Sequence, residues 1–202
     1  KPCFDSYNKY IVPYFTDLNY DIVTFASTYR SNSNIENDIN NVYYMEYANY
    51  RNSYTIQNKH RIKLANKVEE YEKKHNVSFD VIIFLRFDIF FFKPFCDLNI
   101  QLDILNFPRQ LGPNRHDDMI YIVNKKHLHY FINIMKNNIM QNMHVIYRKF
   151  YKNNKINLMK YTNVISRNKP FYIRLFKVIP FPENNYVYDN IEKTVLDYIN
   201  RK

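Results

Sequence analysis

Residues 79–84 (FDVIIF) form a largely apolar, β-branched run, and this run limits the possible folds more than any other segment. Such a run is typical of a central strand that is covered on both faces, because both sets of alternating side chains are then buried. The preceding residues 56–75 carry a stripe at helical spacing, with Lys and Glu over the remaining surface; its members are Leu64, Val68, Tyr71 and His75. This pattern predicts a long amphipathic helix that leads into a buried strand.

The rest of the chain adds further elements of both kinds. Further helices are expected at residues 4–16, 125–136, 139–151 and 190–201. Further strands are expected at residues 21–26, 119–123 and 171–181. Loops are expected at residues 30–41 and 107–118, and residues 42–54 are ambiguous. Strands that alternate with helices predict one α/β domain over residues 1–202, with a mostly parallel central sheet and helices on both faces.

A single glycine, Gly112, occurs in the 202 residues. The phosphate-binding loops GxGxxG and GxxxxGKS need several glycines, so P-loop NTPases and standard dinucleotide-binding enzymes are excluded. The formal net charge of +10 favours anionic partners such as nucleic acid, an anionic membrane surface or phosphorylated small molecules. A coding bias toward Lys in an A+T-rich genome is the alternative explanation of this charge. The basic residues are spread along the chain, which argues against a nucleic-acid-binding arm.

The two cysteines, Cys3 and Cys96, show neither metal-binding nor redox spacing, which fits a reducing compartment. No apolar stretch approaches the about 20 residues that span a bilayer. The first residues, Lys1-Pro2-Cys3, do not resemble a signal peptide. We therefore expect a cytoplasmic protein without a membrane span.

Arg86 and Asp88 interrupt the otherwise apolar stretch 81–92, directly after the predicted strand. Burying an unpaired charge is costly, so both must be paired, solvated or bound to a ligand. An extended chain places them on the same side, and open α/β sheets bind ligands at the carboxyl ends of their strands. Asp88 could ligate Mg²⁺ or Mn²⁺, and Arg86 could pair with phosphate. A structural ion pair between the two residues is the alternative.

A second polar group, residues 115–118 (RHDD), stands at a predicted junction between loop and strand. A carboxylate of Asp117 or Asp118 could act as a general base on an acceptor hydroxyl, or hold an acceptor sugar. His116 could ligate a metal ion. Solvated turn residues are the alternative interpretation, because Asp is common in turns.

Gln57 and Arg61 lie one turn apart on one face at the start of the predicted helix 56–75. The positive end of a helix, together with a guanidinium group, suits a phosphate or a nucleotide base. Most polar residues at a helix start are only solvated, and this remains the alternative.

Taken in order, these segments resemble a family of viral and bacterial GT-A-type glycosyltransferases. In that family a helix ending in YE leads into a strand that reads roughly YDxVIRxRxDLxF, and some members keep a full DxD. The corresponding segments here are Tyr71-Glu72, residues 79–83 (FDVII) and residues 85–91 (LRFDIFF). The family segment DDxFxxG is similar to residues 117–122 (DDMIYI), and DIFxHT is similar to residues 21–28 (DIVTFAST).

The resemblance covers roughly residues 4–136. It implies a single GT-A-like, Rossmann-like domain that transfers a sugar from a UDP- or GDP-sugar to a hydroxyl of a glycan or glycoprotein. Asp88 would hold Mn²⁺ or Mg²⁺ and the donor diphosphate as the last carboxylate of a DxD-like element, and Arg86 would hold donor phosphate or sugar.

Further roles follow from the same resemblance. Gln57 and Arg61 would face the donor, and Asp117 and Asp118 would face the donor sugar or the acceptor as the catalytic carboxylates. The partners would then be a nucleotide-sugar and a glycan, with no nucleic acid. A viral origin would place the enzyme in the host cytoplasm.

The chain departs from the family at two points. Arg86 stands where a strict DxD has its first acid, as in the family members that read RxD. The GxxR that ends the family's first strand is absent because the chain begins after that point, so we expect the domain to lack that strand. Two other functions fit the sequence: an inactive glycosyltransferase-like binding module, or a basic nucleic-acid-binding protein or nuclease.

Overall fold

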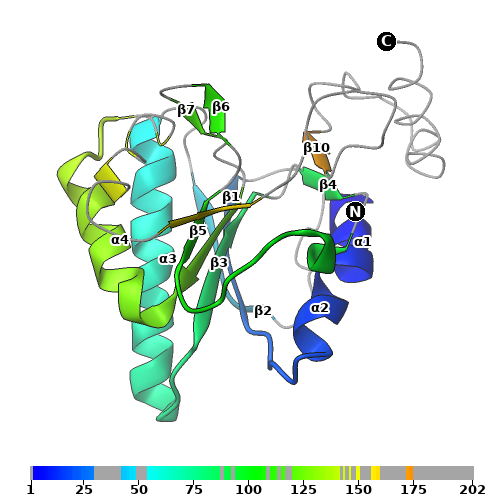
Figure 1. The fold of residues 1–202 in the computed structure, drawn as a ribbon. Helices are drawn as coiled ribbons and strands as arrows, with labels where there is room; N and C mark the ends of the chain where they lie inside the picture. The colour runs from blue at the N-terminus through cyan, green and yellow to red at the C-terminus, as the bar shows by residue number, and fades with distance from the viewer. Residues whose placement is uncertain are drawn as a thin grey trace, which may run out of the picture. The chain divides into compact units, whose positions relative to one another are not determined.

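The computed structural model describes residues 2–29, 42–48, 54–86, 89–91, 94–107, 110–112, 115–116, 120–141, 143, 146, 149–150, 156–159 and 172–174. The chain divides into two compact units, whose elements are drawn in Figure 1. Unit 1 contains residues 1–22, 86–98 and 160–202, and unit 2 contains residues 23–85 and 99–159.

The larger sheet of unit 2 has the strand order β3-β8-β5-β9 among the described residues. Its strands are β3 Val81–Leu85, β8 Ile120–Asn124, β5 Leu105–Phe107 and β9 Ile156–Leu158. The central strand β8 runs antiparallel to both β3 and β5, whereas β5 and β9 are parallel. The strands predicted at residues 79–84 and 119–123 are therefore present, each shifted by one or two residues.

The expected parallel order is not met in this sheet, because two of its three described pairings are antiparallel. The prediction was wrong because β8 is buried on both faces, as the strands of a parallel sheet usually are. Ile120, Tyr121, Ile122 and Val123 are all buried, so both faces of this strand are covered. An antiparallel strand usually alternates between apolar and polar residues, whereas a strand buried on both faces reads as a continuous apolar run like a parallel one.

A second sheet of unit 2 pairs β1 Thr24–Tyr29 with β2 Val42–Ala48 in parallel. The strand predicted at residues 21–26 is present but begins three residues later. The ambiguous Tyr-rich segment 42–54 contributes β2 and the start of the next helix. The predicted loop at residues 30–41 lies outside the described residues.

The two helices named in unit 2 are α3 Tyr54–His75 and α4 Lys125–Asn137, and both match their predicted ranges to within two residues. Asn124 caps α4, since its side chain accepts a hydrogen bond from the Lys126 backbone amide at 3.0 Å. Figure 1 shows α3 and α4 side by side on one face of the four-stranded sheet. In the predicted helix 139–151, residues 139–141 form a turn and a bend instead, and the described residues 143, 146, 149 and 150 are helical.

The core of unit 2 lies between these helices and the sheet. Side chains from α3, α4 and one face of β3, β5 and β8 form one buried cluster around Phe131, which is fully buried. The rings of Phe84 and Phe150 stack on Phe131 with centroid distances of 5.2 and 5.0 Å. Aromatic rings thus supply much of the buried apolar area that stabilises the unit.

A buried asparagine network supports the edge of the same sheet. Asn106 on β5 accepts hydrogen bonds from the Asn157 side chain at 2.8 Å and from the Gln101 backbone amide at 2.9 Å. The Asn106 amide group also donates to the Gln101 and Ile104 carbonyls at 2.7 and 3.1 Å. Buried polar groups that are satisfied in this way fix the pairing of β5 with β9 rather than destabilise the core.

Glu72 ties the carboxyl end of α3 to the start of β3 and to α4. Its carboxylate accepts a hydrogen bond from the Phe79 backbone amide at 2.9 Å and forms a salt bridge with Lys125. The Lys125 backbone amide donates to the Asp80 carbonyl at 2.8 Å, which joins the same two segments again. The Tyr71-Glu72 sequence therefore has a structural role in this unit.

Replacing Glu72 with alanine should lower the free energy of unfolding by about 2–3 kcal/mol, because it removes a charged acceptor and leaves Lys125 unpaired. The matched control is Glu70→Ala, because Glu70 forms only an exposed pair with Lys67, and such pairs contribute about 0.2–1 kcal/mol. Glu72 is 12% exposed and Glu70 is 62% exposed. Urea denaturation measures both variants, and equal losses of stability would contradict the role of Glu72.

Unit 1 contains α1 Pro2–Tyr10, α2 Val12–Thr16, the 3₁₀ helix η2 Phe95–Asp97 and the antiparallel strands β4 Ile89–Phe91 and β10 Tyr172–Arg174. The single helix predicted at residues 4–16 is interrupted at Ile11. The cause is Pro13, which lacks an N–H group and would clash with the carbonyl four residues earlier in a continuous helix.

The packing of unit 1 joins α1 and α2 to the segment 86–98. The Ser6 hydroxyl accepts a hydrogen bond from the Phe91 backbone amide at 3.1 Å. The ring of Phe15 on α2 meets Phe95 edge to face at a centroid distance of 5.8 Å. Burial raises the pKa of Tyr7 above its ordinary value. Of the predicted strand 171–181 only β10 is described, and the predicted helix 190–201 lies outside the described residues.

Candidate functional site

The candidate site is centred on the sheet end where β3 ends and β8 begins. The register pairs Leu85, the last residue of β3, with Ile120, the first residue of β8. In the sequence, Arg86 and Asp88 follow Leu85, and Asp117 and Asp118 precede Ile120. The two predicted motifs are therefore attached to neighbouring strand ends.

The described residues include only part of these motifs. Arg86 is described as half-buried and belongs to unit 1. Asp88, Asp117 and Asp118 lie outside the described residues, so their predicted roles remain predictions.

The first turns of α3 provide the best described part of the candidate site. The Arg61 guanidinium carbon lies 5.6 Å from the ring centroid of Tyr121 on β8, close enough for a cation–π contact. Tyr121 pairs with Phe84, one residue from the end of β3. Arg61 therefore lies in unit 2 near the sheet end where β3 ends and β8 begins. The half-buried Gln57 lies one turn before it on the same helix.

Asn58 holds this arginine in place, and the sequence analysis missed it. Its side-chain oxygen accepts a hydrogen bond from Arg61 Nη1 at 3.2 Å. Its Nδ2 donates to the carbonyls of Ile139 and Gln141 at 3.2 and 2.9 Å. Asn58 is buried, so these bonds are shielded from water. An asparagine three residues before an arginine on one helix face was the available signal.

The segment before β8 contains two short strands where a loop was predicted at residues 107–118. Residues Gln110–Gly112 form β6 and Arg115–His116 form β7, and the two pair antiparallel. The loop prediction is wrong for these residues, because polar and Pro- or Gly-rich composition is typical of tight hairpins as well as of loops. β5 also begins before this segment and takes in Phe107.

No group of three or more His, Cys, Asp or Glu side chains within the described part of the chain could hold a metal ion. The predicted ligand Asp88 lies outside the described residues. No helix in the described segments is long and apolar enough to cross a membrane.

Lys126 and His127 shape the electrostatics at the start of α4. Burial, and then the neighbouring Lys126 ammonium group, lower the pKa of His127, and Asp103 opposes them. His127 is therefore more often neutral than a free histidine.

The described part of the site offers a positioned guanidinium at the start of a long helix and two adjacent strand ends. A guanidinium held in this way can bind phosphate through two parallel hydrogen bonds. Comparison with protein-family models and with curated proteins gives no match for this chain.

Proposed function

We propose that this chain is a glycosyltransferase that moves a sugar from a UDP- or GDP-sugar to a hydroxyl of a glycan or glycoprotein. The main support is the pairing of Leu85 with Ile120 at neighbouring strand ends. In the sequence, the RFD motif directly follows Leu85, and the DD motif shortly precedes Ile120. A transferase needs groups for the donor diphosphate and groups for the reacting hydroxyl in one place. The two motifs carry those chemical types.

The donor diphosphate would be held by cationic groups. Arg61 supports this role because Asn58 fixes its side chain before any ligand arrives, which lowers the entropic cost of binding. The resemblance to the transferase family assigns donor phosphate or sugar to Arg86 as well, and Gln57 would donate or accept hydrogen bonds at the nucleotide. The net charge of +10 also favours an anionic donor.

Asp88 would hold the metal ion. The candidate ligands here are carboxylate oxygens, the atoms that Mg²⁺ and Mn²⁺ prefer in proteins. Such an ion, when bound, offsets negative charge on the departing diphosphate.

Asp117 and Asp118 would act on the acceptor. One carboxylate would accept the proton of the acceptor hydroxyl while the hydroxyl oxygen forms a bond to the anomeric carbon. The bond between that carbon and the diphosphate oxygen breaks, and the nucleoside diphosphate leaves with the electron pair. The second carboxylate would orient the sugar through its hydroxyls.

Incubating the purified chain with UDP- and GDP-sugars and Mn²⁺, with and without hydroxyl-bearing acceptors, tests the proposal. The expected result is release of UDP or GDP that depends on Mn²⁺ and rises with an accepted sugar. Absence of release from every donor, alongside Mn²⁺-dependent nucleotide binding, would contradict the enzymatic proposal and favour a binding module.

A further inference from the structure

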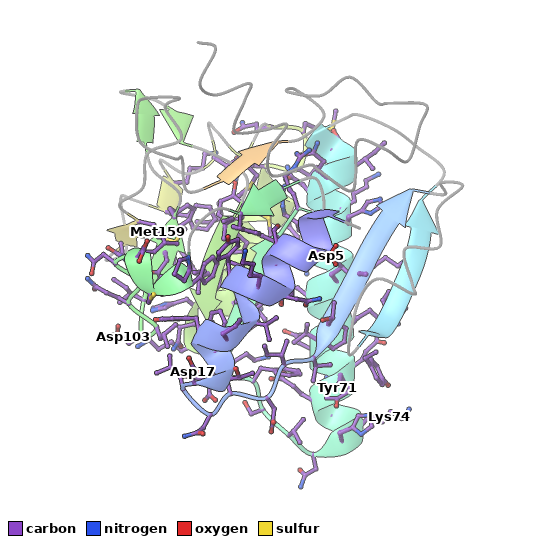
Figure 2. All side chains as sticks on the ribbon, turned by 90° about the vertical axis from the view of Figure 1, so that its right-hand side faces the viewer. Asp5, Asp17, Tyr71, Lys74, Asp103 and Met159 are labelled. Carbon is purple, nitrogen blue, oxygen red and sulfur yellow. The ribbon has the colours of Figure 1, made fainter. Side chains whose placement is uncertain are left out.

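Five aromatic rings gather at the carboxyl end of α3, where this helix meets β1 and β2. Their neighbouring ring centroids are between 4.3 and 6.2 Å apart. We refer to this cluster as the aromatic platform, and its members are Phe25, Tyr43, Tyr71, His75 and Phe79. Figure 2 labels Tyr71 and its neighbour Lys74 in the last turns of α3.

The inner part of the platform is fixed to the core of unit 2. Phe25 and Phe79 are partly buried and pack against the main hydrophobic cluster. Tyr71 meets Phe25 edge to face at 5.7 Å and lies 5.6 Å from Phe79. The rings beyond them therefore rest on a rigid base.

The outer part of the platform faces solvent. Tyr43 is 43% exposed, and residues 73–78 are all exposed, with His75 stacked on Tyr71 at 4.3 Å. The Lys74 ammonium group lies 3.4 Å from the Tyr43 hydroxyl. A large ring that is both exposed and held by its neighbours can bind a ligand without losing much conformational entropy.

The charges beside the platform indicate what kind of ligand it fits. Lys73 and Lys74 are exposed, and so are Asp80 in the turn after α3 and Glu70, whose carboxylate forms an ion pair with Lys67. This mixture opposes a polyanion, because the carboxylates repel phosphates. It suits a neutral polyhydroxyl ligand, whose hydroxyls can donate to carboxylates and accept from ammonium groups.

We propose that the aromatic platform binds a neutral, hydroxyl-rich glycan chain. One face of a pyranose ring presents polarised C–H bonds, and this face would pack against the negative π face of Tyr43. Lys74 and the neighbouring carboxylates would hydrogen-bond to the sugar hydroxyls at the edge of the ring.

The platform is separate from the proposed donor site. Gln57 and Arg61 lie in the first turns of α3, whereas Tyr71 and His75 lie in its last turns. Ten residues separate Arg61 from Tyr71, which corresponds to about 15 Å along a helix. The platform would hold a remote part of the acceptor chain, and this assignment of the glycan as acceptor rests on the proposed transferase function.

Affinity electrophoresis of the full chain in gels containing mannan, dextran, galactan or β-glucan tests the proposal. We expect at least one of these polysaccharides to retard the protein. Tyr43→Ala should weaken that binding by about five- to tenfold, as expected for the loss of one stacked ring, and Tyr43→Phe should keep it. The matched control is Tyr10→Ala, because Tyr10 is a half-buried tyrosine with the Lys9 ammonium group 4.9 Å from its ring centroid.

Several results would overturn this proposal. One is the absence of retardation by all four polysaccharides, and another is equal retardation of wild type and of a folded Tyr43→Ala variant. If Tyr43→Ala does not fold, as judged by its thermal midpoint, Lys74→Ala takes its place and should also weaken binding. Binding of an oligo-dT strand that is lost in these variants, without polysaccharide binding, would assign the platform to nucleic acid.

The two proposals can fail separately. Asp88→Ala should reduce kcat/KM for sugar transfer by about 10³-fold or more and leave retardation by the polysaccharide unchanged. Conversely, Tyr43→Ala should leave Mn²⁺-dependent nucleotide binding unchanged. Loss of retardation in Asp88→Ala would contradict a separate glycan site.

Discussion

Phe131→Ala should lower the free energy of unfolding by about 4 kcal/mol, enough to remove much of the stability of a typical domain. Phe131 is fully buried and stacks with Phe84 and Phe150. Its ring also lies 5.7 Å from that of Tyr121. Alanine would leave a cavity between rings that belong to three different elements and cannot close around it. Chemical denaturation followed by circular dichroism measures the loss.

Two further variants define the cause of this effect. Phe131→Leu should cost about 1–1.5 kcal/mol, because most of the volume is retained. His129→Ala, on the exposed side of the same helix, should change stability by no more than about 0.5 kcal/mol. Equal stability of Phe131→Ala and His129→Ala would contradict the placement of Phe131 at the centre of the core.

Asp88→Ala should reduce kcat/KM for sugar transfer by about 10³-fold or more. The proposed function makes Asp88 the residue that holds the metal ion beside the donor diphosphate. Without it, negative charge on the leaving group is not offset, and groups of this kind contribute factors of about 10²–10³ each. The loss should appear at saturating donor as well as at low donor concentration, because charge develops in the transition state.

Asp17→Ala provides the control for this experiment. Asp17 is an exposed aspartate that ends α2, and its removal deletes the same charge without touching the proposed site. Its transfer rate should match that of the wild type. Similar rates for Asp88→Ala and Asp17→Ala, with both proteins folded, would show that Asp88 does not act in transfer.

The helices α3 and α4 and the buried strands β3 and β8 of unit 2 could be predicted closely from the sequence, whereas the buried strand β5 was not predicted. α3 and α4 carry apolar stripes at helical spacing, and the residues on the α4 stripe, such as Leu128 and Met135, are buried in the structure. β3 and β8 are continuous apolar runs, which favours buried strands. In each case local periodicity and burial pointed to the same element.

The direction of the strands could not be predicted. A run such as Ile120–Val123 must be buried on both faces, but burial on both faces is compatible with either direction. Direction depends on pairing between distant segments, such as Leu85 with Ile120, and a single sequence does not reveal that pairing. The break in the predicted helix 4–16 could have been read from Pro13.

The candidate site was predicted in part. Arg61 was selected for its charge and position on the helix, and the structure adds Asn58 as the residue that holds it. The aromatic platform was missed because Tyr43 lies in a segment without clear periodicity. His75 was assigned to an apolar stripe, whereas it is exposed. Exposure of an aromatic side chain is a property of the fold and has no local sequence signal.

Thermal unfolding in the presence of Mn²⁺ and nucleotides tests the central claim most directly. The experiment compares UDP, GDP and UDP-sugars, with and without Mn²⁺, for the wild type and Asp88→Ala. A ligand at a hundredfold excess over Kd stabilises the folded state by about 2.7 kcal/mol, which corresponds to a rise in Tm of roughly 5–10 °C for a chain of this size. The proposed function predicts such a shift for one nucleotide base, dependent on Mn²⁺ and lost in Asp88→Ala. No shift with any nucleotide in the folded wild-type protein would contradict it.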